Sequence, residues 1–196
     1  MSRLFLIATA VALFVTPVTA QQPNDRRGFW YGVGFGAGSG KLHCSICNDQ
    51  SGTDLTASLR AGGALSNSWL LGVEFDGWTN SQDVGTRRSW SASAVALWYP
   101  WPAKGAYAKG GVGFTGYRAS DSRDVISTTR PGGLIGIGYE WRIGRKSSIN
   151  PYLHYQRTLA GDLTFEHTGN NTVTTATIAD DASISSLQFG VGLVIH

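Results

Sequence analysis

Large apolar residues alternate with small or polar residues along most of the chain from Phe29 onward. In residues 29–41, Tyr31, Val33 and Phe35 share one face of an expected strand, and glycine occupies nearly every position of the other face. A period of two is typical of β-strands, because successive side chains point to opposite faces of a sheet. The pattern therefore predicts an all-β protein whose strands carry one large apolar face and one small or polar face.

The alternation recurs in eight segments. In most of them the face assignment is clear, but the alanines of residues 88–99 compete for the outer face with Val95, Leu97 and Tyr99, and residues 106–117 alternate weakly. Both of these registers stay open. The expected strands span residues 29–41, 54–65, 69–79, 88–99, 106–117, 132–143, 148–160 and 184–196.

The connections alternate in length. Residues 42–53, 80–87, 118–131 and 161–183 are long and polar, whereas residues 66–68, 100–105 and 144–147 are short. Long extracellular loops at one end and tight turns at the other are typical of outer-membrane barrels, and strands of this length are long enough to cross a bilayer at a tilt. The sequence predicts an eight-stranded antiparallel up-and-down transmembrane β-barrel.

The start of the chain predicts export. Arg3 precedes an apolar stretch over residues 4–15, and residues 18–20 supply the small residues of a cleavage site. We expect a signal peptide over residues 1–20, a short periplasmic segment over 21–28 and the barrel over 29–196. Only 15% of residues are charged, and the net charge of +3 is too small to indicate a nucleic-acid partner.

Tryptophans fall near the ends of the expected strands. Indole rings favour the headgroup level of a bilayer, so this distribution predicts two aromatic girdles. A soluble eight-stranded ligand-binding barrel is the weaker alternative. Trp30, Trp69, Trp98, Trp101 and Trp141 fall at the short-turn ends, and Trp78 and Trp90 at the long-loop ends.

Several stretches resemble the small outer-membrane β-barrel proteins of bacteria, the group that includes OmpX- and OmpW-like proteins. They are residues 72–78 (GVEFDGW), 99–102 (YPWP), 109–114 (KGGVGF) and 136–145 (GIGYEWRIGR), with the region of Cys44 and Cys47. The resemblance implies a monomer in the cell outer membrane, placed there by the outer-membrane insertion machinery and surrounded by lipid and lipopolysaccharide. Such barrels often end in an aromatic residue, whereas this chain ends in His196.

Charged residues occupy the expected inner face in balanced numbers. Because a buried charge is tolerated only when it is paired, this balance predicts a salt-bridge network that fills the barrel; a proton or ion path is the alternative. The predicted interior network consists of Arg60, Glu74, Asp76, Lys109, Glu140, Arg142, His154 and Gln156.

Catalytic patterns are sparse. Nucleophilic hydrolysis needs a hydroxyl or thiol beside an oriented base, but Tyr152 and Gln156 flank His154 on its face of the strand. We expect a non-enzymatic protein without cofactor or metal, whose loops serve envelope-structural or surface-interaction roles. An outer-membrane enzyme that hydrolyses or transfers acyl chains of lipid A is the alternative.

Two features of the long-loop end remain. Cys44 and Cys47 predict a local disulfide in an exported protein, with a metal site that includes His43 as the alternative. Five basic residues at the loop ends could contact lipopolysaccharide phosphates, or could be solvated charges partly paired with Asp83, Asp121 and Asp124. These basic residues are Lys41, Arg87, Arg88, Arg118 and Arg130.

Overall fold

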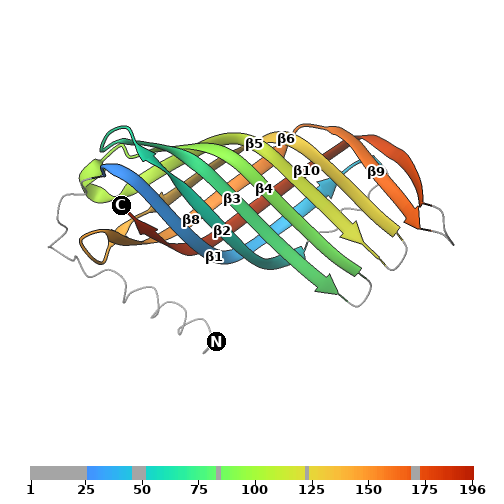
Figure 1. Cartoon of the computed structure of the whole chain (residues 1–196), viewed down its shortest axis with the longest axis horizontal. Helices are drawn as coiled ribbons and strands as arrows, with labels where there is room; N and C mark the ends of the chain where they lie inside the picture. The colour runs from blue at the N-terminus through green and yellow to red at the C-terminus, as the bar shows by residue number, and fades with distance from the viewer. Residues whose placement is uncertain (1–25, 46–51, 83–84, 122–123, 169–172) are drawn as a thin grey trace, which may run out of the picture.

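The chain folds into a closed antiparallel β-barrel whose strands are strongly tilted to its long axis (Figure 1). The computed structural model describes residues 26–45, 52–82, 85–121, 124–168 and 173–196. Neighbouring strands pair in chain order, and β1 (Gly28–His43) closes the sheet against β10 (Val173–Ile195). The strands between them are β2 (Gly52–Ala64), β3 (Trp69–Gln82), β4 (Gly85–Trp98), β5 (Ala106–Ser120), β6 (Asp124–Tyr139), β7 (Trp141–Arg142), β8 (Ser147–Thr158) and β9 (Gly161–Thr168).

Two of the walls consist of a pair of consecutive strands. β6 and β7 both pair with β8, and β8 and β9 both lie between β6 and β10. Counting each pair as one wall gives eight, so the predicted eight-stranded all-β fold is confirmed. A 3-10 turn, η1 (Pro102–Lys104), joins β4 to β5. Among the described residues, no helix is long and apolar enough to cross a membrane.

The alternation of the sequence separates the outside of the barrel from its inside. Val33, Val73 and Ile137 are 44%, 47% and 60% exposed. They belong to the large set of apolar side chains that point away from the barrel interior. The structure also settles which faces of residues 88–99 and 106–117 point into the barrel. In β4, Val95 and Leu97 point inward, and in β5 the outward row includes Val112.

Three of the four connections predicted as long loops are mostly paired strand, so this expectation was wrong. β3 and β4 pair as far as Gln82 and Gly85, and β5 and β6 pair as far as Ser120 and Val125. Most of residues 161–183 belong to the hairpin of β9 and β10, which extends the sheet beyond β1 (Figure 1). These segments contain many threonine, valine and isoleucine residues, which favour extended backbone even where they carry no clear alternation.

The girdle interpretation was wrong for two tryptophans. Trp30 is 1% exposed and packs inside the barrel, and Trp78 lies on the same face of β3 as the buried Glu74. Trp69 and Trp98 do face outward, side by side with ring centroids 6.2 Å apart. The alternation of β1 places residue 30 on its inner face, and this constraint outweighs the preference of an indole for the membrane surface.

Glycines on the inner face leave the space that large side chains from other strands occupy. A Cβ atom on Gly136 would lie 2.7 Å from Cβ of His154, and one on Gly138 would lie 2.4 Å from Cζ of Tyr107. Both distances are shorter than side chains tolerate. The glycine row is therefore what allows an eight-stranded barrel to hold aromatic and charged residues in its interior.

We expect Val33→Arg, Val73→Arg and Ile137→Arg each to lower the free energy of unfolding by about 2–4 kcal/mol, because a guanidinium would face the hydrocarbon core of the bilayer. Leu65→Arg, in the exposed turn between β2 and β3, is the matched control and should have little effect. Unfolding by denaturant in lipid vesicles measures both. Small and equal losses in all four variants would contradict the assigned lipid-facing surface.

Candidate functional site

The interior polar groups form three layers, the first of which closes the end that carries the short turns and the C-terminus. Glu140, at the break between β6 and β7, accepts hydrogen bonds from Arg26 Nε (3.1 Å) and from the Tyr99 hydroxyl (2.6 Å). The Arg26 guanidinium lies 3.6 Å from the centre of the Tyr99 ring. His196 Nε2 lies 3.3 Å from Glu140 Oε2. One buried carboxylate therefore joins residues from both ends of the described chain.

The second layer holds the Arg60 guanidinium. Arg60 donates to Asn150 Oδ1 on β8 (2.6 Å) and to the Tyr107 hydroxyl on β5 (3.2 Å). Tyr107 in turn donates to the same Asn150 oxygen (3.0 Å), and the Asn150 amide donates to the backbone oxygen of Tyr139 (3.1 Å). The bonds that Arg60 and Tyr107 donate connect strands that are not neighbours in the sheet, so they brace the barrel across its interior, whereas the bond from Asn150 to Tyr139 joins the neighbouring strands β8 and β6.

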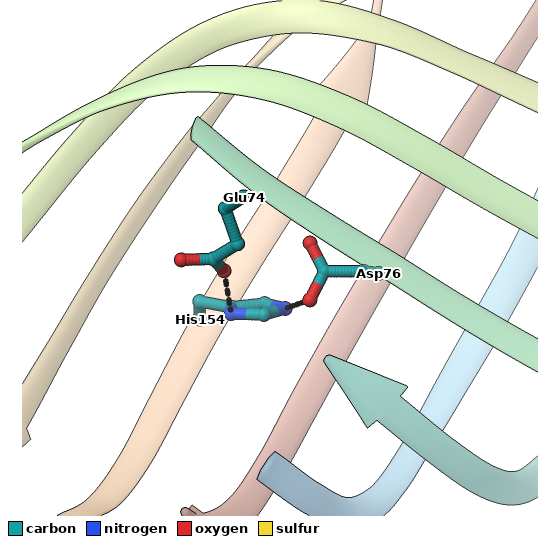
Figure 2. A group of neighbouring side chains, drawn as sticks. All are labelled: Glu74, Asp76 and His154. Carbon is teal, nitrogen blue, oxygen red and sulfur yellow. Dashed lines mark ion pairs between the residues drawn. The ribbon is translucent and has the colours of Figure 1, made fainter. Parts of the chain in front are cut away.

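The third layer brings together Glu74, Asp76, Lys109 and His154. Lys109 Nζ lies 2.5 Å from Glu74 Oε1 and 3.0 Å from His154 Nδ1. The imidazole lies between the two carboxylates, with Glu74 near one ring nitrogen and Asp76 near the other (Figure 2). Ser91 donates to Asp76 Oδ2 at 3.2 Å. All four charged or imidazole side chains are buried.

An apolar cluster occupies the interior around the first two layers. It contains Tyr99 and Tyr107, whose ring centroids lie 5.3 Å apart. The rings of these two tyrosines belong to the apolar cluster, and their hydroxyl groups form the hydrogen bonds of the first two layers. This packing fills the short-turn half of the barrel. Its members are Trp30, Leu70, Val95, Leu97, Tyr99, Tyr107, Leu134 and Val194.

The residues predicted for the interior lie as follows. Arg60, Glu74, Asp76, Lys109, Glu140, His154 and Gln156 are buried, and Arg142 is half-buried. Gln156 donates from its amide to the Thr115 hydroxyl. Sequence reasoning missed Arg26, which it placed in a periplasmic segment, and the neutral partners Tyr99, Tyr107 and Asn150. The inward parity of Asn150 follows from that of His154, whereas the registers of the segments that carry Tyr99 and Tyr107 were open. Parity also does not give the depth at which side chains from distant strands meet.

The five basic residues predicted near the long-loop end separate into three groups. Arg88 and Arg118 are exposed and lie directly opposite each other across β4 and β5, and Lys41 is exposed on β1. Arg87 is half-buried, on the inner face that also carries Ser89. Arg130 forms an ion pair with Asp162 at 3.2 Å. Only the first group presents its charge freely toward the surroundings.

The remaining candidate residues lie at the same end. His43 Nε2 lies 3.0 Å from the Ser185 hydroxyl. Cys47 lies outside the described residues, so its disulfide with Cys44 stays a prediction. His167 Nδ1 lies 2.6 Å from Asp124 Oδ1 in an exposed pair between β6 and β9.

Comparison with solved structures gives the same fold. Neisserial surface protein A matches with a TM-score of 0.51 and 18% identity over 86% of this chain and 96% of that chain. Ail, the attachment invasion locus protein of Yersinia pestis, matches with a TM-score of 0.53 and 11% identity over 86% and 99%. The outer-membrane protein OprG of Pseudomonas aeruginosa matches with a TM-score of 0.51 and 12% identity over 89% and 100%.

No family model matches the sequence, and no curated protein matches it. At these identities the likeness to solved structures concerns the fold. Together with the outward apolar surface, it shows that the chain has the fold of the small eight-stranded β-barrels of bacterial outer membranes.

We expect Glu140→Gln to lower the free energy of unfolding by about 3–5 kcal/mol, because the buried Arg26 guanidinium loses its counter-charge. Asp162→Asn is the control, since it breaks the partly exposed pair with Arg130 and should cost at most about 1 kcal/mol. Denaturant unfolding of the three proteins in the same detergent gives the comparison. Equal effects of the two substitutions would show that the first layer contributes no more than a surface ion pair.

Proposed function

We propose that this protein is a non-enzymatic integral outer-membrane barrel whose interior is filled and whose extracellular hairpins serve envelope-structural or surface-interaction roles. The observation that carries the proposal is the buried network from Arg26 to His154, which crosses the interior in three layers together with an apolar cluster. Eight strands enclose a space that side chains fill, and here those side chains are hydrogen-bonded across the barrel.

The extended hairpins support a role at the cell surface. In outer-membrane barrels the short turns face the periplasm and the longer connections face outward. Here the described residues of the far end belong to hairpins, formed by β3 with β4, β5 with β6, and β9 with β10. A stiff β-hairpin presents side chains in fixed positions, which suits contact with other molecules of the envelope or with an external surface.

The proposal also includes a signal peptide for export and a disulfide between Cys44 and Cys47. A signal peptide over residues 1–20 would deliver the chain to the periplasm, from which the insertion machinery would place it in the outer membrane. Cys44 and Cys47 would then lie on the extracellular side, where a disulfide is stable.

An enzyme acting on lipid A remains the second candidate because of one observation. His167 and Asp124 form a base–acid pair at the hairpin end, where His167 would be accessible. Catalysis would also require a nucleophile within reach of the imidazole. The residues described around this pair show no hydroxyl hydrogen-bonded to His167.

Two measurements on the reconstituted protein test the proposed function. We expect no ion conductance across planar bilayers, because the interior is packed, and no release or transfer of acyl chains from lipid A. Steady single-channel conductance would contradict the filled interior. Acyl release that His167→Ala abolishes would establish the enzyme instead.

The partner that we propose for Arg88 and Arg118 is a phosphate group of lipopolysaccharide. Like charges directly opposite each other destabilise a sheet, and in the described part of the chain neither guanidinium has an ion-pair partner. The outward Trp90 follows Arg88 by two residues along β4 and lies opposite Gly116, which precedes Arg118 by two residues on β5. Arginine binds phosphate through two parallel hydrogen bonds, so a phosphate between the two side chains would relieve their repulsion.

We expect Arg88→Ala combined with Arg118→Ala to lower the melting temperature in bilayers that contain lipopolysaccharide and to leave it unchanged or raised in neutral detergent. Arg145→Ala combined with Lys146→Ala removes two charges at the short-turn end and is the matched control. Thermal unfolding in both media separates the effects. Equal losses in the two media would assign the arginines to folding and exclude phosphate contact.

A further inference from the structure

The third layer places three potential metal ligands from opposite walls of the barrel at one point. Glu74 and Asp76 lie on β3 and His154 lies on β8, and three strands separate these walls in either direction around the sheet. Each residue offers one ligand atom, and these atoms all lie within 4.8 Å of one another. Figure 2 shows the two carboxylates and the imidazole directed toward each other.

The side chains of this group also carry buried polar atoms without a hydrogen-bond partner. Glu74 Oε2, Asp76 Oδ1 and His154 Nε2 are all buried and form no hydrogen bond. The residues are 1%, 5% and 2% exposed. A buried polar atom without a hydrogen bond costs free energy. It is therefore unusual that Glu74, Asp76 and His154, which lie together, each carry one such atom.

We propose that Glu74, Asp76 and His154 form an interior binding site for one divalent first-row transition-metal ion, which binds one oxygen of each carboxylate and one nitrogen of the imidazole. Ligands at about 2.0–2.2 Å from one zinc ion lie at most about 4.4 Å apart, so small side-chain rotations bring the three donors onto one ion. Two carboxylates balance the +2 charge. The imidazole nitrogen favours zinc or iron over magnesium and calcium, which prefer oxygen ligands alone.

Lys109 is the competitor for this site. Its ammonium group lies 2.5 Å from Glu74 Oε1 and donates toward His154 Nδ1, so it supplies positive charge to the same two residues. Arg60, in the adjacent layer, adds a second positive charge to the same interior. A divalent ion would therefore bind the wild-type protein against the repulsion of Lys109, and removal of that ammonium group should tighten binding.

The ion would join β3 to β8 through the centre of the barrel. Neutral and charged hydrogen bonds already brace other strands across the interior. In the described part of the chain, β3 and β8 are joined by the ion pairs of the His154 imidazole, at 3.5 Å from Glu74 and 3.9 Å from Asp76. Metal bonds at this point would tie opposite walls together. Metal binding should therefore raise the melting temperature of the protein.

Zinc binding to the purified full-length mature protein in detergent tests the site. We measure bound zinc after equilibrium dialysis and use cobalt as a spectroscopic probe, with magnesium as the comparison ion. We expect one zinc per chain, binding at least tenfold tighter in Lys109→Met and at least tenfold weaker in His154→Phe. Zinc should also restore the melting temperature that Lys109→Met loses.

Two controls separate this site from other ligands. His167→Ala removes an exposed imidazole beside a carboxylate, and Cys44→Ser with Cys47→Ser removes both thiols; neither change should alter zinc binding. If Lys109→Met does not fold, the amount of zinc bound by the wild-type protein is compared with the amounts bound by His154→Phe and Glu74→Gln, and this comparison tests the site. Absence of zinc from the wild-type protein and every folded variant, unchanged binding in His154→Phe, or loss that follows the cysteines would overturn the proposal.

Discussion

The hydrogen-bond ladder between β1 and β10 is the contact on which the rest of the structure depends. It runs without a break from Tyr31 paired with Ile195 to His43 paired with Ser183. In a bilayer no water satisfies the backbone groups of an open strand edge, so a spanning sheet must close on itself. Closure at eight strands leaves a narrow interior, and this width then limits which side chains each inner position can accept.

The narrow interior explains why glycine and long polar residues occur together on one face. A glycine on one strand, such as Gly136, gives room to a large side chain on the next, such as His154. The large side chains then meet in the middle, where charges must be paired. Lys109 with Glu74 and Arg26 with Glu140 are such pairs, and tyrosine and asparagine supply the neutral donors and acceptors between them.

Those features that depend on the faces of single strands follow from the sequence. The outward position of Val73 and the inward position of Glu74 need only the period of two, and the same period places Trp30 inside despite its aromatic ring. Features that depend on several strands do not follow. The meeting of His154 with Glu74 requires the stagger of four successive strand pairings in either direction around the barrel, and no single strand carries that information. The composition of residues 161–183 likewise did not reveal the paired length of the hairpin of β9 and β10.

The C-terminal residue shows how parity decides residue type at the end of a strand. Val194 points inward and the outward apolar row ends with Leu193 and Ile195, so residue 196 falls on the inner side. A phenylalanine side chain there could not hydrogen-bond the buried carboxylate of Glu140. Histidine instead places Nε2 at 3.3 Å from that carboxylate, while its backbone N–H donates to the oxygen of Lys146. Arg26 donates to the same carboxylate, so the first and the last residues of the described chain meet at one buried charge beside the seam between β1 and β10.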